Sequence, residues 1–208
     1  MAWWLATKEV VQLTMNDKRE RILKAGVNVF ARRGFYSAKV SEIARAAGVA
    51  DGTIYLYFRN KDEILLSIFE QEMSRFITVV ENETGGEESG LDKIRKLVRV
   101  HLGFVKKNPD LAQVFQLELR QSNKFIKKYD GSKLKEYLDL IGKFIKQGQR
   151  EGSLRTDLPP GLVKRSLFGA LDEIATHWVL SGGRKYDIEQ SADQIADIFI
   201  SGVAVQPK

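Results

Sequence analysis

The chain has 208 residues, of which 43% are hydrophobic and 29% are charged, and its formal net charge at pH 7 is +6. This composition is typical of a globular protein with enough apolar side chains to bury a core. The absence of cysteine excludes disulfide scaffolds, thiolate zinc sites and cysteine nucleophiles, and it fits a reducing compartment, so we predict a cytoplasmic protein. No window approaches the roughly 18 apolar residues of a membrane span, and we expect no membrane association.

Helical periodicity extends over nearly the whole chain, and no strand pattern or repeat is visible. Residues 1–15 are expected to form a disordered arm, because chain termini are commonly poorly ordered. Helices are then predicted over Asp17–Arg33, about Val40–Ala47 and about Asp51–Phe58, with Gly34 and Gly48 ending the first two. A long helix begins at Lys61, and the polar segment Glu81–Gly90 is predicted to be a mobile loop.

Five more helices are expected after this loop. They are predicted over about residues 91–105, 108–122, 133–150, 157–182 and 188–202. The second of them starts at Asn108-Pro109, a capping residue followed by a proline at the first helical position. We therefore predict an all-α protein of about nine helices, with a three-helix head over residues 16–61 and a helical bundle over residues 62–208.

The basic excess of the chain is confined to the head. Residues 16–61 carry ten basic and four acidic side chains, whereas the rest of the chain carries 23 of each. A solvated basic face is the ordinary explanation of such an excess, but its confinement to one short segment favours a polyanionic partner.

No catalytic or metal-binding pattern is recognisable. His101 and His177 are too far apart for a motif of metal-ligand spacing, and there is no glycine-rich phosphate loop. The neighbouring carboxylates Asp172 and Glu173 point in different directions on a helix, so we expect polar contacts or pocket lining rather than a catalytic dyad. We predict that the protein is not an enzyme and holds no metal or cofactor.

The segment Ile43–Val49 followed by Gly52–Tyr55 has the pattern of a helix-turn-helix motif. Gly48 supplies a left-handed backbone for the turn, and the small side chain of Ala44 allows the two helices to touch. The second helix of such a motif lies in the major groove of DNA with its N-terminal residues at the base edges. Tyrosine hydroxyls and helix N-terminal amides there suit phosphate oxygens.

These residues resemble the signature of the TetR family of bacterial repressors. The matching stretches are Gly34-Phe35, Ser41–Val49 and Gly52–Lys61, in which the glycines, the spacing and the Tyr-x-Tyr-Phe sequence agree. The resemblance implies a homodimer that binds a pseudo-palindromic operator in double-stranded DNA. The DNA-binding residues that it implies are Lys39, Arg45, Ala50, Asp51, Gly52, Thr53, Tyr55, Tyr57 and Lys61.

Two positions of the head depart from the family pattern. Position 39 is Lys where the family often has a capping Thr or Ser, and position 51 is Asp where a basic residue is frequent. The carboxylate of Asp51 either accepts a hydrogen bond from a cytosine amino group or stabilises the first turn of its own helix.

Further patches resemble a subset of the family, the repressors of fatty acid degradation genes of Bacillus and Thermus type. The patches are Val49–Phe58, Gln116–Asn123, Phe168–Val179 and Lys185–Asp187. The subset implies that long-chain acyl-coenzyme A is the effector and that its binding releases the protein from its operator. An acyl chain requires a dry tunnel, in which each buried methylene contributes about 0.8 kcal/mol.

Candidate ligand-binding residues lie along the apolar helical faces of the bundle. They are Met73, Phe76, His101, Leu102, Phe115, Leu119, Arg120, Asn123, Ile141, Phe144, Phe168, Leu171, Asp172 and Trp178. The coenzyme phosphates need cations, and Arg120, Lys124, Lys127 and Lys128 are available. Core packing remains the alternative for the apolar residues, a hydrogen-bonded core histidine for His101, and a solvated cluster for the lysines.

The last two helices are strongly apolar, and the resemblance places them at a two-fold interface that would bury Trp178, Ile195, Ile198 and Phe199. Ligand bound between bundle helices would shift the long helix that starts at Lys61, change the separation of the two heads and disfavour DNA binding. The alternatives are a TetR-type repressor that senses another apolar or drug-like compound, an enzyme that uses acyl-coenzyme A, and a structural helical protein.

Overall fold

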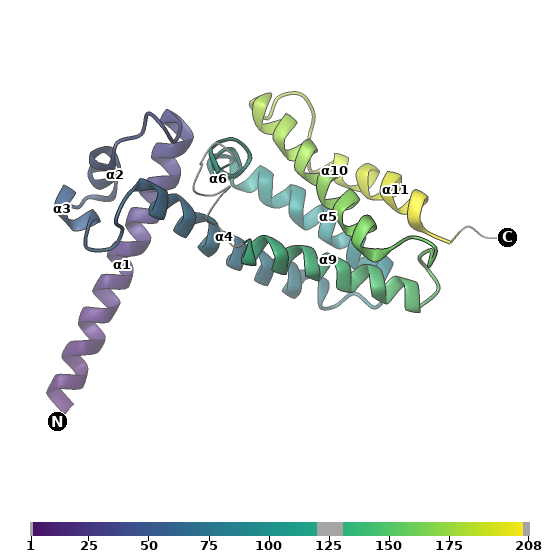
Figure 1. Ribbon diagram of the computed structural model, residues 1–208, viewed down its shortest axis with the longest axis horizontal. Coiled ribbons are helices and arrows are strands. Elements are labelled where there is room, and N and C mark those ends of the chain that lie inside the picture. Colours follow the sequence, from purple (N-terminus) through teal and green to yellow (C-terminus); the bar gives the residue numbers. More distant parts are fainter. Residues whose placement is uncertain (1, 120–130, 206–208) are drawn as a thin grey trace. The chain divides into compact units, whose positions relative to one another are not determined.

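The computed structural model describes the backbone of residues 2–119 and 131–205, and the side chains of these residues from Asp17 onward (Figure 1). The helices are α1 (Ala2–Arg33), α2 (Val40–Ala47), α3 (Asp51–Ile54), α4 (Lys61–Thr84), α5 (Gly90–Lys107), α6 (Pro109–Gln113), the π-helix η1 (Val114–Glu118), α9 (Ser132–Arg150), α10 (Pro160–Leu180) and α11 (Ser191–Val203). Within the described ranges there is no strand, and one isolated β-bridge pairs Leu154 with Ala204. The predicted all-α class is confirmed.

The chain divides into two compact units. The first contains residues 1–71 and 117–129, and the second contains residues 72–116 and 130–208. Helix α4 therefore begins in the first unit and ends in the second, whereas the sequence predicts a boundary directly after Lys61.

Helix α1 begins at Ala2, whereas the sequence predicts a disordered arm over residues 1–15. Residues 2–16 contain no glycine or proline and several good helix formers, among them alanine, leucine, lysine and glutamate. Because nothing in this segment interrupts a helix, α1 continues through it up to Arg33.

The first unit is held together by a small apolar core. Its most buried side chains are Ile22 and Phe30 of α1, Ile43 and Ala44 of α2, Ile54 of α3, Phe58 of the connection between α3 and α4, and Ile64, Leu65 and Ile68 of α4. Each is at most 2% exposed, so α1, the two short helices α2 and α3 and the first half of α4 share one desolvated interior.

The second unit is a bundle in which α5 packs against α9 and α11, and α10 packs against α9. Helix α5 buries Ile94, Leu97 and Val98 on one face, at the spacing of three and four residues that an amphipathic helix requires. The Ser89 hydroxyl caps this helix by accepting a hydrogen bond from the Asp92 amide at 3.0 Å.

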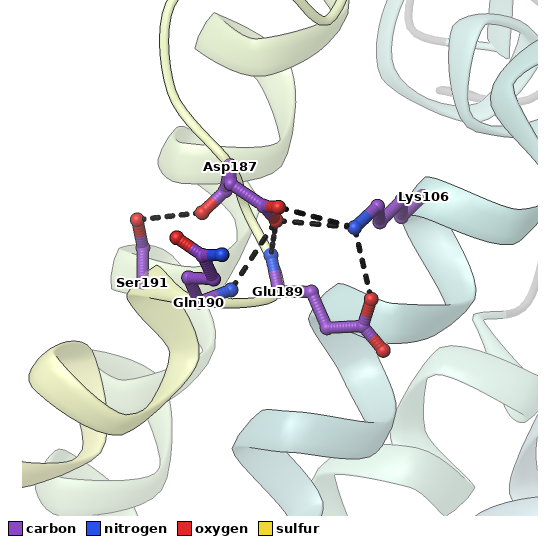
Figure 2. Close-up of polar contacts among 5 residues, drawn as sticks. All are labelled: Lys106, Asp187, Glu189, Gln190 and Ser191. Carbon is purple, nitrogen blue, oxygen red and sulfur yellow. Dashed lines mark hydrogen bonds and ion pairs between the residues drawn. The ribbon is translucent and has the colours of Figure 1, made fainter.

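Asp187 organises the start of α11 and ties it to α5 (Figure 2). Its carboxylate accepts hydrogen bonds from the amides of Glu189 at 3.0 Å and Gln190 at 3.3 Å, and its carbonyl accepts one from the Ser191 hydroxyl. The Lys106 ammonium donates to the carboxylates of Asp187 and Glu189. The Gln190 amide and the Lys106 ammonium hold the pKa of Asp187 below its usual value.

Several helix ends differ from the predicted ones. Helix α3 stops at Ile54, because Tyr55–Tyr57 form hydrogen-bonded turns instead of continuing the helix to Phe58. Helix α4 runs to Thr84, whose hydroxyl donates to the carbonyl of Val80 at 2.7 Å, so the loop predicted from Glu81 starts later.

The segment that follows α5 differs from the predicted continuous helix as well. The Asn108 side chain donates to the carbonyl of Phe104 at 2.9 Å and thus caps the end of α5 rather than the start of α6. Helix α6 then gives way at Val114 to the π-helix η1, and the predicted end at Ser122 lies outside the described residues.

Candidate DNA-binding head and ligand core

Helices α2 and α3 form the predicted helix-turn-helix, and Gly48 is its turning point. Gly48 has φ of +66° and ψ of +39°, a left-handed conformation that glycine adopts without strain. The Val49 amide donates to the carbonyl of Ala44 at 3.0 Å, and the Gly48 amide donates to that of Arg45 at 3.2 Å. These bonds satisfy the last carbonyls of α2 and confirm the predicted turn.

Most of the predicted DNA-binding residues lie on the surface around α3. Lys39, Arg45, Ala50, Asp51, Gly52 and Tyr55 are exposed, and Thr53 and Tyr57 are half-buried. The buried Ile54 and Phe58 anchor the segment that carries them. The exposed side chains Tyr36 and Leu56 lie in the same unit, and the sequence pattern did not single them out. Contact with DNA remains a prediction for all of these residues.

Lys61 has partners inside the protein. Its ammonium donates to the carbonyls of Phe35 at 2.8 Å, Tyr36 at 2.8 Å and Ala38 at 3.3 Å, and it lies 4.8 Å from the centre of the Phe35 ring. One cation thus binds three carbonyls of the connection between α1 and α2. The structure gives Lys61 an architectural role, and its predicted contact with DNA stays untested.

An aromatic cluster occupies the interior of the second unit. The Phe76 ring of α4 lies 4.8 Å from Phe104, 5.2 Å from Tyr137 and 5.5 Å from His101, between ring centres. Phe168 of α10 lies 6.2 Å from Tyr137 in an edge-to-face arrangement. These five side chains come from four helices and converge here. Three of them, Phe76, His101 and Phe168, belong to the predicted ligand set.

A polar pair lies within this cluster. His101 Nδ1 is 2.8 Å from the hydroxyl oxygen of Tyr137. Burial lowers the pKa of His101 to about 4, against the opposing effect of the nearby Asp172 carboxylate, and burial also raises the pKa of Tyr137. Both side chains are therefore neutral at pH 7, which leaves a hydrogen-bonding pair without net charge among apolar rings.

The remaining predicted ligand residues fall into three groups. Met73, Leu102, Ile141, Phe144 and Leu171 are buried in the second unit, and Phe115 and Asp172 are half-buried there. Leu119 is buried but belongs to the first unit. Arg120, Asn123, Lys124, Lys127 and Lys128 lie outside the described residues.

Trp178 lies against the turn at Gly183. A Cβ atom built at Gly183 would lie 2.9 Å from its ring, and the Gly183 amide donates to the Trp178 carbonyl at 3.0 Å. The indole therefore packs on the turn that ends α10.

Sequence reasoning missed Tyr137, Phe104 and the hydrogen bond from the Thr176 hydroxyl to Gln116 at 2.9 Å. Tyr137 lies four residues before Ile141 and shares its buried helical face, so the helical spacing could have identified it as an interior residue. The Thr176 contact joins residues 60 positions apart, for which the sequence contains no local signal.

Among the described residues, a groove of about 250 Å³ opens between α4 and α5. It is lined by Val79, Glu83, Lys96, Arg99, Val100, Gly103, Phe104, Lys107 and Glu189. None of the predicted ligand residues lines it. Lys96 Nζ lies 3.3 Å from Glu83 Oε2, and Arg99 pairs with Asp193. Two cations of the groove therefore already have carboxylate partners.

The described residues contain no group of three or more His, Asp or Glu side chains suited to a metal ion. None of their helices has the length and apolar character that crossing a membrane requires.

Comparison with known proteins gives two adjacent family matches. Residues 22–68 match the model of bacterial regulatory proteins of the tetR family, and residues 69–202 match the C-terminal region of YsiA-like proteins. The fatty acid metabolism regulator protein of Bacillus subtilis is 35% identical over 192 residues, which cover 91% of this chain and 98% of that protein.

Two solved structures of similar proteins share the fold. The fatty acid degradation regulator FadR of Bacillus halodurans has a TM-score of 0.84 and 37% identity, and the match covers 89% of this chain and 95% of that one. FadR of Bacillus subtilis, solved in complex with stearoyl-CoA, has a TM-score of 0.83 and 36% identity, with 88% and 98% covered. The chain thus belongs to the TetR family of bacterial transcriptional regulators and is homologous to its fatty acid metabolism regulators.

Proposed function

We propose that this protein is a dimeric transcriptional repressor of fatty acid degradation genes that long-chain acyl-coenzyme A releases from its operator. The observation that carries the effector assignment is the 36% identical FadR structure in complex with stearoyl-CoA. The comparisons do not favour a drug-like effector or an enzyme, because similar proteins are named as regulators of fatty acid metabolism or degradation.

The DNA-binding part of the proposal is supported by the surface around α3. Asp51, Gly52 and Tyr55 are exposed there, on a segment that Ile54 and Phe58 fix to the core. The excess of six basic side chains over residues 16–61 supplies the attraction to phosphate. Operator binding should therefore weaken steeply with salt, whereas burial of an acyl chain should not.

The effector part of the proposal is supported by the aromatic cluster and the buried side chains around it. Phe76, Phe168 and Leu171 offer apolar surface for an acyl chain, and the His101–Tyr137 pair offers hydrogen bonds for a polar group. We propose in addition that Arg120, Lys124, Lys127 and Lys128 bind the coenzyme phosphates.

The dimer part of the proposal rests on apolar side chains that the second unit leaves in water. Leu162 and Leu180 of α10 are 59% and 66% exposed, and Ile198 of α11 is 77% exposed. A two-fold interface through these helices would bury all three, together with the half-buried Ile195 and Phe199.

Helix α4 connects the proposed effector site to the DNA-binding head as one continuous helix. It carries Phe76 of the aromatic cluster in the second unit and Lys61 in the first. We propose that ligand binding shifts α4 and thereby the separation of the two heads, so that they no longer match the spacing of the operator half-sites. A cytoplasmic location agrees with this function.

Selection of bound sequences from a random DNA duplex library tests the proposal. The enriched duplex is then titrated with the protein in the presence of stearoyl-CoA, coenzyme A or no ligand, at fixed salt. We expect a pseudo-palindromic sequence whose binding is weakened by stearoyl-CoA and unaffected by coenzyme A. Enrichment of no sequence, turnover of the thioester, or a response only to drug-like compounds would contradict the proposal.

A further inference from the structure

Glu118, at the end of η1, is the only charged side chain that is buried among the described residues, with 7% exposure. Removing a carboxylate from water is unfavourable unless hydrogen bonds replace its hydration. Its Oε2 atom accepts a hydrogen bond from the Phe35 amide at 2.6 Å. The same oxygen lies against Gly34, where a built Cβ atom would be 3.5 Å away. A residue from the middle of the chain thus binds the turn that follows α1.

Charged groups hold Phe35 from two directions. Glu118 binds its amide, and the Lys61 ammonium binds its carbonyl at 2.8 Å. The Phe35 ring itself is buried, at 3% exposure. Since this residue lies in the connection from α1 to α2, the two charges fix where the helix-turn-helix starts relative to α1.

The π-helix η1 lies where the chain passes from one unit to the other, between Gln116 and Leu117. On the second-unit side, Gln116 accepts a hydrogen bond from the Thr176 hydroxyl of α10 at 2.9 Å. On the first-unit side, Glu118 accepts from Phe35. Two residues of one helical turn therefore have partners in different units.

A π-helical turn contains about one residue more than an α-helical turn, and such turns occur frequently at functional sites. Conversion of η1 to an α-helical turn would rotate the residues after it by about 100°, the angle of one residue in a helix with 3.6 residues per turn. Glu118 could not keep its hydrogen bond to Phe35 through such a rotation.

We propose that Glu118 is a positioning residue of the DNA-binding head, and that its bond to Phe35 exists only while η1 is π-helical. Effector binding in the second unit rewinds η1, withdraws the carboxylate and loosens the connection between α1 and α2. This inference rests on the proposed function and names a route of regulation for the same ligand site.

The test uses two substitutions of Glu118 in the full-length protein. Glu118→Ala removes the hydrogen-bond acceptor, and Glu118→Gln keeps an acceptor without the charge. Glu136→Ala, at an exposed carboxylate of α9, is the matched control for the change in net charge. Three quantities are measured: operator affinity with and without stearoyl-CoA, stearoyl-CoA affinity by calorimetry, and hydrogen exchange of the Phe35 amide.

We expect Glu118→Ala to weaken ligand-free operator binding about tenfold or more, the effect of losing a hydrogen bond to a charged group, while stearoyl-CoA affinity is kept. Removing one negative charge would by itself strengthen DNA binding, so Glu136→Ala should not weaken it. The loss of charge and the loss of the Glu118 hydrogen bond therefore change operator affinity in opposite directions. Glu118→Gln should restore most of the affinity. In the wild type, stearoyl-CoA should accelerate exchange at Phe35, and in Glu118→Ala exchange should be fast without ligand.

Wild-type operator affinity in Glu118→Ala, or Phe35 exchange that stearoyl-CoA leaves unchanged, would overturn the proposal. If Glu118→Ala does not fold, exchange in the wild type and operator affinity of Glu118→Gln still decide it. Failure of the proposed function is distinguishable, because the wild type itself would then select no operator or show no response to stearoyl-CoA.

Discussion

His101 Nδ1 lies 2.8 Å from the hydroxyl oxygen of Tyr137, inside the aromatic cluster of the second unit. The two groups are hydrogen-bonding partners of each other, and desolvation holds the imidazole in its neutral form. The stability of the protein should therefore depend on pH through His101.

The pH dependence has a definite sign. The unfolded chain protonates His101 near pH 6.5, whereas the folded protein does so only near pH 4. Between these values the unfolded state binds a proton that the folded state does not, so stability is lost as the pH falls, by about 1.4 kcal/mol per unit. Urea unfolding near pH 6.5 and near pH 5, at one protein concentration, measures this loss.

His101→Gln is the control for this prediction, because its amide can still hydrogen-bond Tyr137 but does not titrate. Carboxylates such as Asp187 and Asp193, whose pKa values are lowered from 3.8, lose their contribution below this window. An equal loss of stability in His101→Gln would show that His101 is not the titrating group.

The exposed glycine at the start of α3 should matter for DNA and not for folding. A methyl group at Gly52 would meet no atom within 4 Å, and Gly52 does not have a positive φ. We expect Gly52→Ala to leave the melting temperature unchanged and to weaken operator binding, because the backbone could no longer approach the phosphates closely.

Gly48 provides the contrasting substitution. It has equally open surroundings but a φ of +66°, so Gly48→Ala should lower the free energy of unfolding by about 1 kcal/mol through backbone strain. Thermal unfolding and operator titration of the two variants separate the effects. Loss of stability in Gly52→Ala would contradict the assignment.

Lys61 should stabilise the first unit whether or not DNA is present. Replacing it by Met removes hydrogen bonds to three carbonyls, and we expect a loss of about 2 kcal/mol in the free energy of unfolding, measured in urea without DNA. Unchanged stability together with a smaller salt slope of operator binding would instead mean that its ammonium acts on phosphate alone.

Ile198 should be needed for the dimer and not for the fold of one chain. Because its side chain is 77% exposed, Ile198→Asp should change the stability of the single chain by no more than about 0.5 kcal/mol. Placing a charge in an apolar two-fold interface should dissociate the dimer. Sedimentation equilibrium measures the mass, and a dimer that persists would place the interface elsewhere.

Much of the fold is predictable from the sequence because it depends on local patterns. The apolar spacing along α5, the left-handed Gly48 and the serine cap of α5 each act within one or two helical turns. The extent of α1 and the π-helical turn at Val114 were not predicted. The full length of α1 was not predicted because the general expectation that chain termini are disordered was given more weight than the absence of helix-breaking residues. The π-helical turn has no sequence signature.

The sequence by itself determined the all-α class, the helix-turn-helix and the confinement of the positive charge to the head, since periodicity, glycine placement and charge can be read residue by residue. Only the tertiary structure decided that Lys61 binds backbone carbonyls, that Tyr137 pairs with His101 and that Glu118 binds Phe35. The reason is that these bonds join residues 26, 36 and 83 positions apart. Their partners become neighbours only when burial of the apolar faces brings the helices together.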